Sequence, residues 1–231
     1  MKSRMLDLFS ASFFLSCILL NHSVAQEREP LDVTRPPQFV LLAYDGSKSL
    51  NSWSNTRSYA REMTAAGKPV KYTYFISGVY FLSPANKSLY DAPIKGPGIS
   101  AIGFGKSPLD IGKRIDQVNA AFKEGHEIAS HANGHFSSNT WTEANWQSEF
   151  SQFNSLVFDA AKNNGISKKF GFTEKEIVGY RSPELSYSSG LWPTLRANYF
   201  LYDTTKVNEA TYWPEKSIFG IWNFQIGRAH V

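Results

Sequence analysis

The segment that decides the interpretation of this chain reads Gly125-His126-Glu127-Ile128-Ala129-Ser130-His131-Ala132-Asn133-Gly134-His135. Residues 127–130 are short and mostly apolar, as in a buried strand, and two of the chain's five histidines follow at His131 and His135. Imidazole is the commonest metal ligand. One helical turn would bring positions i and i+4 onto the same face. The segment therefore predicts a strand that leads into a metal-binding pair.

Other interpretations of this histidine pair are available. Either residue could be an ordinary surface or core histidine. A zincin-type protease is not expected, because Ala132 stands where that motif needs its Glu base. Two ligands do not complete a metal site, so a third donor must come from elsewhere in the chain. His126, which lies before the strand, is interpreted as structural.

The N-terminus has the features of an export signal. Lys2 and Arg4 precede the mostly apolar residues 6–20, and Ser23-Val24-Ala25 offers a cleavage site. We expect a signal peptide over 1–25 and a linker over 26–37, with an uncleaved anchor as the alternative. The only cysteine, Cys17, lies in this signal. The mature protein is then secreted or periplasmic, without a stable membrane anchor.

The C-terminus ends abruptly after an apolar run. Residues 226–231 match one translated frame of a common sequencing adaptor, so we expect an adaptor-derived tail in which His230 has no function. The domain at 38–225 is then truncated. Composition narrows the function further: a net charge of +4 with scattered basic residues excludes a nucleic-acid-binding face. The 15% aromatic content suits either stacking on sugars or a large core.

Apolar and amphipathic segments alternate along the chain. We expect strands at 39–44, 72–76, 127–130, 177–180 and 199–202, an apolar run at 218–224, and helices at 54–66, 108–123, 142–163 and 190–197. The first strand should be buried, and the irregular stretch at 77–107 could line a substrate groove. This order predicts one α/β domain with a parallel sheet, open or barrel-like.

Ionisable residues fall at the ends of these strands, namely Asp45, His131, Arg181 and Asp203. Each has an ordinary explanation by itself, as a turn, a helix cap or a surface ion pair. The carboxyl ends of parallel strands share one face, however, and sites form there. Their joint placement therefore predicts a site of the metal-hydrolase type.

At these positions the chain resembles the polysaccharide deacetylases with a NodB-homology domain, over about 38–224. The family motif T-F-D-D-G corresponds to Ala43-Tyr44-Asp45-Gly46-Ser47. The motif H-[ST]-x-x-H corresponds to 131–135, and R-x-P-[FYW] corresponds to Arg181-Ser182-Pro183-Glu184. Tyr202-Asp203-Thr204 resembles the Y-D-S-S segment that follows.

The resemblance implies a distorted (β/α) barrel, incomplete at its C-terminus, and a secreted hydrolase that removes N-acetyl groups from a peptidoglycan or chitin-like polymer. Its expected cofactor is a divalent metal, zinc by preference, and its partner is an N-acetylated glycan. The implied metal ligands are Asp45, His131 and His135. The implied catalytic residues are Asp45 as base and Arg181 as its holder. The implied substrate-binding residues are Tyr44, Ser182, Pro183 and Glu184.

The chain departs from the family pattern in three places. Gly46 replaces the second Asp, the usual metal ligand, so Asp45 is either the base or a ligand. Glu184 replaces an aromatic residue of the substrate groove. No L-x-x-H follows to supply the general acid, and we expect little turnover from the chain as it stands. Two alternatives therefore stay open: a glycan-binding protein with impaired catalysis, and a hydrolase of another amide or ester.

Overall fold

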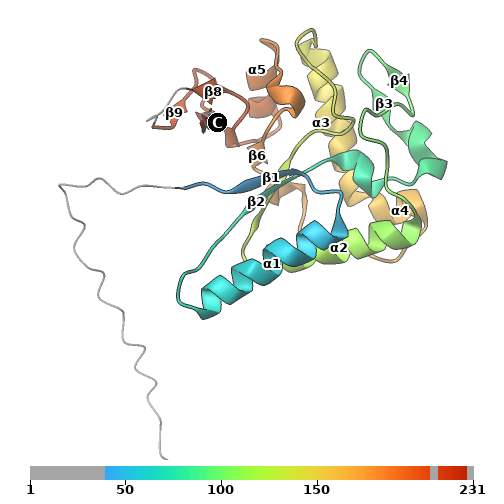
Figure 1. Cartoon of the computed structure of the whole chain (residues 1–231). Coiled ribbons are helices and arrows are strands. Elements are labelled where there is room, and N and C mark those ends of the chain that lie inside the picture. Colours follow the sequence, from blue (N-terminus) through green and yellow to red (C-terminus); the bar gives the residue numbers. More distant parts are fainter. Residues whose placement is uncertain (1–39, 209–212, 228–231) are drawn as a thin grey trace, which may run out of the picture. The chain divides into compact units, whose positions relative to one another are not determined.

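The structure is a computed structural model that describes residues 40–208 and 213–227. The expected signal peptide, the linker and residues 228–231 of the expected tail lie outside these ranges. The described residues from Leu41 onward form one compact unit (Figure 1). Among the described residues, every helix is too short or too polar to cross a membrane.

A mostly parallel sheet organises the unit. Its order is β1 (Ala43–Gly46), β2 (Thr73–Ile76), β5 (Glu127–Ser130), β6 (Gly179–Tyr180), β7 (Tyr202–Asp203), β10 (Trp222–Asn223) and β9 (Glu215–Lys216). Only the β10–β9 pair is antiparallel. The predicted α/β class with a parallel sheet is confirmed. The described strands form an open sheet with β1 and β9 at its edges, which does not exclude the expected barrel.

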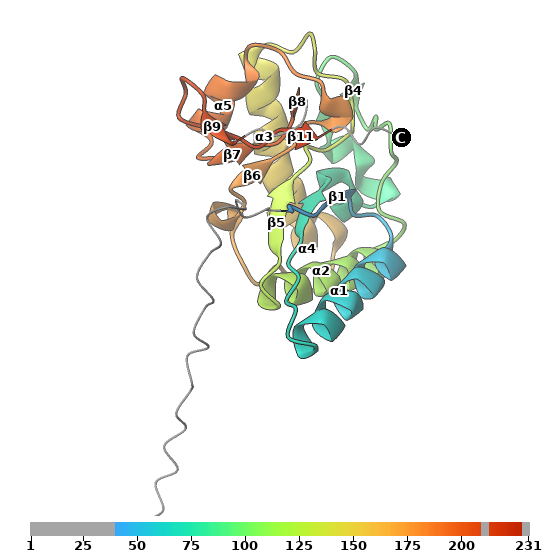
Figure 2. The same cartoon turned by 60° about the vertical axis from the view of Figure 1, so that its left-hand side comes forward.

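In the part of the chain that the structure describes, five α-helices connect and cover these strands: α1 (Leu50–Ala65), α2 (Pro108–Lys123), α3 (Glu143–Phe158), α4 (Ala160–Asn164) and α5 (Leu191–Ala197). The hydroxyls of Ser49, Ser107 and Thr142 cap the first three, each accepting from an N–H three residues on. Helices α1 and α2 pack side by side in both views (Figures 1 and 2). The helix expected at 142–163 is divided at Asp159, whose φ and ψ of −93° and 11° are not helical.

Short elements fill the connections. The stretch expected to be irregular, 77–107, contains the 3-10 helices η1 (Gly78–Phe81) and η2 (Pro84–Leu89) and a hairpin of β3 (Asp91–Ala92) and β4 (Gly96–Pro97). The others are η3 (Glu174–Glu176), η4 (Pro183–Leu185), β8 (Val207–Asn208) and β11 (Ile226–Gly227). The first two residues of the expected tail thus form β11, which pairs with β8.

The core is aromatic, with fully buried side chains that include Trp53, Trp146, Phe150, Phe153 and Tyr180. The prediction of a buried first strand is wrong. Leu41 precedes β1 and is 73% exposed. Tyr44, within β1, is 41% exposed, because β1 is an edge strand whose only neighbour in the described sheet is β2. Of the two explanations for the high aromatic content, a large core agrees with these buried aromatic side chains.

Candidate active site

An ion pair joins two strand ends that lie far apart in the sequence. Asp45 stands in β1, and Arg181 directly follows β6. Arg181 Nη1 donates to Asp45 Oδ1 over 2.8 Å, and the two side chains are 13% and 43% exposed, respectively. The guanidinium is thus largely covered while the carboxylate remains accessible to solvent. The predicted partnership between these two residues is present in the structure.

Two residues that sequence reasoning did not assign hold the guanidinium. Arg181 Nε donates to Thr204 Oγ1 over 2.7 Å, and its planar face lies 4.4 Å from the centroid of the Phe75 ring. A planar donor fork fixed on two sides loses little freedom when it binds a carboxylate. Thr204 is the last residue of the segment that resembles Y-D-S-S, so the resemblance included this position without giving it a role.

His131 and His135 meet across a turn. Their ring centroids are 5.3 Å apart and the ring planes cross at 67°. The turn is not helical, which corrects the one-helical-turn model of this pair: Ala132 and His135 have left-handed φ values of 52° and 59°. Residues of β5 are extended up to Ser130, and the chain then reverses instead of entering a helix.

The hydrogen bond made by His131 fixes its tautomer. Its Nδ1 lies 2.8 Å from the carbonyl oxygen of Arg181. Because a carbonyl oxygen only accepts, Nδ1 carries the proton, and the neutral ring keeps a lone pair on Nε2. Burial lowers the pKa of His131, an effect partly opposed by the nearby Asp45 carboxylate. Arg181 therefore serves both halves of the site, with its side chain on Asp45 and its carbonyl on His131.

The donor set fits a metal ion only in part. Two imidazoles are close together, and one has a free Nε2. Within residues 40–208 and 213–227, no three His, Cys, Asp or Glu side chains are grouped to hold a metal. The position of the family's second Asp is Gly46, whose φ is +79° and whose added Cβ would lie 3.8 Å from the Tyr80 ring.

The four expected substrate-binding residues are not gathered at one place. The Tyr44 ring packs on Tyr72 and Tyr74, and successive strand residues point to opposite faces, so it lies away from Asp45. Ser182 and Pro183 are buried, and the Ser182 N–H is already bonded to Thr205 Oγ1 over 3.0 Å.

The remaining residue of that group, Glu184, is exposed on η4 with a left-handed φ of 56°. Asp203, at the end of β7, is buried, and burial raises its pKa to about 6. It accepts a hydrogen bond from Thr205.

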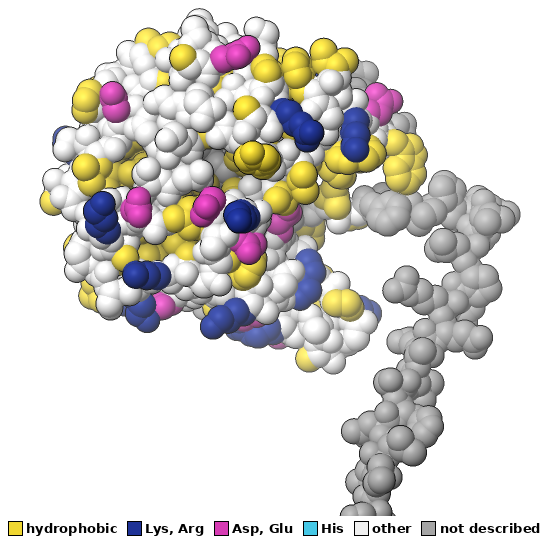
Figure 3. Space-filling model, turned by 180° about the vertical axis from the view of Figure 1, so that it is seen from behind, with side chains coloured by type: hydrophobic (Ala, Val, Ile, Leu, Met, Phe, Trp, Pro, Cys, Tyr) yellow, Lys and Arg dark blue, Asp and Glu magenta, His cyan; other side chains and the backbone are white. Residues whose placement is uncertain are grey.

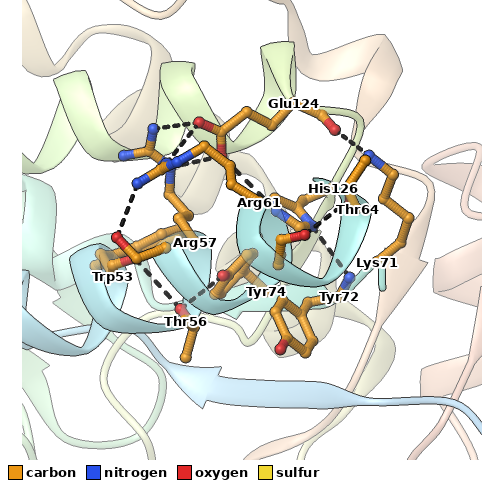
Figure 4. A network of polar contacts seen from close by, with 12 residues as sticks. Trp53, Thr56, Arg57, Arg61, Thr64, Lys71, Tyr72, Tyr74, Glu124 and His126 are labelled. Carbon is orange, nitrogen blue, oxygen red and sulfur yellow. Dashed lines mark hydrogen bonds and ion pairs between the residues drawn. The ribbon is translucent and has the colours of Figure 1, made fainter. Parts of the chain in front are cut away.

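His126 belongs to a separate polar network (Figure 4). Its Nδ1 accepts from the N–H of Tyr72 over 3.2 Å, and its ring stacks on the Tyr72 ring. Near it, Glu124 binds the guanidinium of Arg57 over 2.6 Å and that of Arg61 over 3.0 Å. The ring is buried and its contacts are structural, in agreement with the interpretation from sequence.

The molecular surface carries no segregated basic face in the view of Figure 3, where acidic and basic side chains are interspersed. This distribution agrees with the low net charge of the sequence.

Comparisons with known proteins add similarities in fold. No family model and no curated protein matches the chain. Among solved structures it resembles a family 4 carbohydrate esterase from Streptomyces lividans in complex with acetate, at 14% identity and a TM-score of 0.46, over 74% of this chain and 64% of that one. It also resembles the chitin deacetylase of Colletotrichum lindemuthianum, at 18% identity and a TM-score of 0.43, over 71% and 53%.

A third structure is a CE4 family pseudoenzyme from Bacillus anthracis, at 10% identity and a TM-score of 0.45, over 71% of this chain and 42% of that one. The chain thus spans between 42% and 64% of the length of these three proteins.

Proposed function

We propose that the protein is a secreted, metal-dependent hydrolase that removes N-acetyl groups from a polysaccharide of the peptidoglycan or chitin type. The observation that carries the proposal is the double role of Arg181, which binds the Asp45 carboxylate and the His131 ring at once. A carboxylate, an oriented imidazole and a fixed cation at the carboxyl ends of β1, β5 and β6 of one sheet are suited to hydrolysis of an acyl bond.

Asp45 is the general base in this proposal. It is accessible to water and substrate, and the guanidinium holds it in one orientation. We assign Asp45 the role of base and not of metal ligand, since a carboxylate that is bound by Arg181 and also by a metal would be a poor proton acceptor. The expected magnitude for a positioned base is about a hundredfold or more in rate.

His131 and His135 would hold the metal, with zinc as the expected ion. When bound, such a cation polarises the acyl oxygen and lowers the pKa of water. His131 is prepared for this role because its Nδ1–H donates to a backbone carbonyl, which leaves Nε2 for the ligand bond. His135 contributes the second imidazole from the far side of the turn.

The test uses an ester that needs no general acid. p-Nitrophenyl acetate releases a weakly basic phenolate, so its hydrolysis requires only the base and the metal. We expect zinc-dependent hydrolysis that is lost in His131→Ala together with the bound zinc, and lost in Asp45→Asn with the zinc retained. Hydrolysis that survives in both variants would contradict the proposal. Acetate release from N-acetylglucosamine oligomers then tests the substrate class.

Gly46 favours a second candidate, a glycan-binding protein that has lost catalysis. A glycine supplies no ligand at the position where the resembling family has one. Binding of N-acetylglucosamine oligomers without release of acetate or p-nitrophenol, in the presence of zinc, would support this candidate over the first.

A further inference from the structure

A buried acid lies behind the turn that carries the two histidines. Glu149, in the middle of α3, is 1% exposed. Within the described part of the chain, no basic side chain lies at ion-pair distance from it. A buried carboxyl group is costly unless hydrogen bonds compensate for its lost hydration. Its hydrogen-bond partners therefore indicate what it does there.

Those partners are the turn and one tyrosine. The N–H of Asn133 donates to Glu149 Oε1 over 2.8 Å, and the Tyr90 hydroxyl lies 3.1 Å from Oε2. The same hydroxyl accepts from the N–H of Gly134 over 3.1 Å. Asn133 Nδ2 also donates to the backbone oxygen of Glu149 over 2.8 Å. Two consecutive N–H groups between His131 and His135 therefore end on this acid and this hydroxyl.

The turn needs such support. Left-handed backbone at two non-glycine residues costs about 1–3 kcal/mol each and persists only where the surroundings impose it. The packing is also tight: a Cβ on Gly134 would lie 2.7 Å from the Tyr90 hydroxyl, and one on Gly78 would lie 2.0 Å from Asn133 Oδ1.

We propose that Glu149 and Tyr90 are positioning residues that fix the turn and thereby set the relative orientation of the His131 and His135 rings. The inference rests on the proposed function for its consequence, which is metal affinity, but the orientation itself can be measured without metal. Neither residue touches the imidazoles, so both act through Asn133 and Gly134.

The test is Tyr90→Phe in the full chain, with Tyr74→Phe as the matched control. Both tyrosines are buried, and each variant loses one hydroxyl group. The Tyr74 hydroxyl belongs to the network around His126, where it lies 2.7 Å from Thr56 Oγ1. In metal-free protein, Tyr90→Phe should speed amide exchange at Gly134 and shift the ring resonances of His131 and His135. Tyr74→Phe should change neither.

Zinc affinity gives the second measurement. We expect Tyr90→Phe to weaken zinc binding by about tenfold or more, as loss of support around a ligand commonly does. Glu149→Gln keeps an acceptor for Asn133 and should retain most of the affinity. If Tyr90→Phe and the control give the same exchange rates and ring resonances, the inference is wrong. If the parent binds no zinc, the proposed function fails, while the metal-free measurements still decide the inference.

Discussion

Replacing Glu149 by Gln should remove part of the loss of folding stability that we expect as the pH rises. Burial raises the pKa of this carboxyl from its ordinary value of 4.5 to about 7. The folded protein therefore binds a proton more tightly than the unfolded chain does. The favourable contribution is complete below the unfolded pKa and is lost as the pH rises through the folded one. Each tenfold change in proton affinity corresponds to about 1.4 kcal/mol, so ionisation costs about 3 kcal/mol.

Gln has nearly the shape and the hydrogen-bonding groups of the protonated acid and cannot ionise. The titratable groups that face Glu149 are the hydroxyls of Tyr90 and Tyr180, whose pKa values burial raises further above the working range. They stay neutral in both proteins. Asp203, whose pKa is also raised, contributes equally to parent and variant and cancels in the difference.

The assay is urea unfolding in the presence of a chelator at about pH 5 and about pH 8.5. Between these values the variant should gain about 2–3 kcal/mol relative to the parent, starting from similar stability at the acid end. Glu62→Gln, the same change at an exposed position of α1, should show no such gain. A parent that loses no more stability than the Glu149→Gln protein over this range would refute the reasoning.

Three further changes test the site and its surroundings. Gly46→Asp has room for its Cβ and costs about 1 kcal/mol in backbone strain. The new carboxylate should tighten zinc binding on the order of tenfold in a chelator competition. Unchanged zinc affinity would argue against a missing ligand at this position. Arg181→Lys keeps the charge but not the fork, so hydrolysis of p-nitrophenyl acetate should fall by about a hundredfold with zinc binding intact, whereas an unaltered rate would disprove the role given to the guanidinium. His126→Phe removes the acceptor for Tyr72 and should cost about 1–2 kcal/mol at neutral pH. Burial lowers the pKa of His126, so the parent loses stability as the pH falls below the unfolded value of about 6.5, and urea unfolding should show a smaller loss in this variant.

The fold was predictable where one local signal dominated. Helix α2 lies at the predicted residues, because Ser107 and Pro108 mark its start and its apolar residues repeat with a helical period. Strand β1 was misjudged because an apolar run does not reveal whether a strand is central or at an edge. That depends on the order of strands in the sheet, which is a long-range property. The division of the helix expected at 142–163 was not predicted either, because no proline or glycine marks it in the sequence.

The candidate site was predictable only to the level of residue types at strand ends. Asp45, His131 and Arg181 could be brought together from sequence because parallel strands place their carboxyl ends on one face. The residues that orient them could not, since Thr204 reaches Arg181, and Glu149 reaches Tyr90, by hydrogen bonds between residues that are distant in the sequence. A buried Glu within a helix has the same sequence signature as an exposed one. The reactive groups in the sequence are therefore enough to propose a function. The orientation of those groups depends on residues that only the folded structure distinguishes.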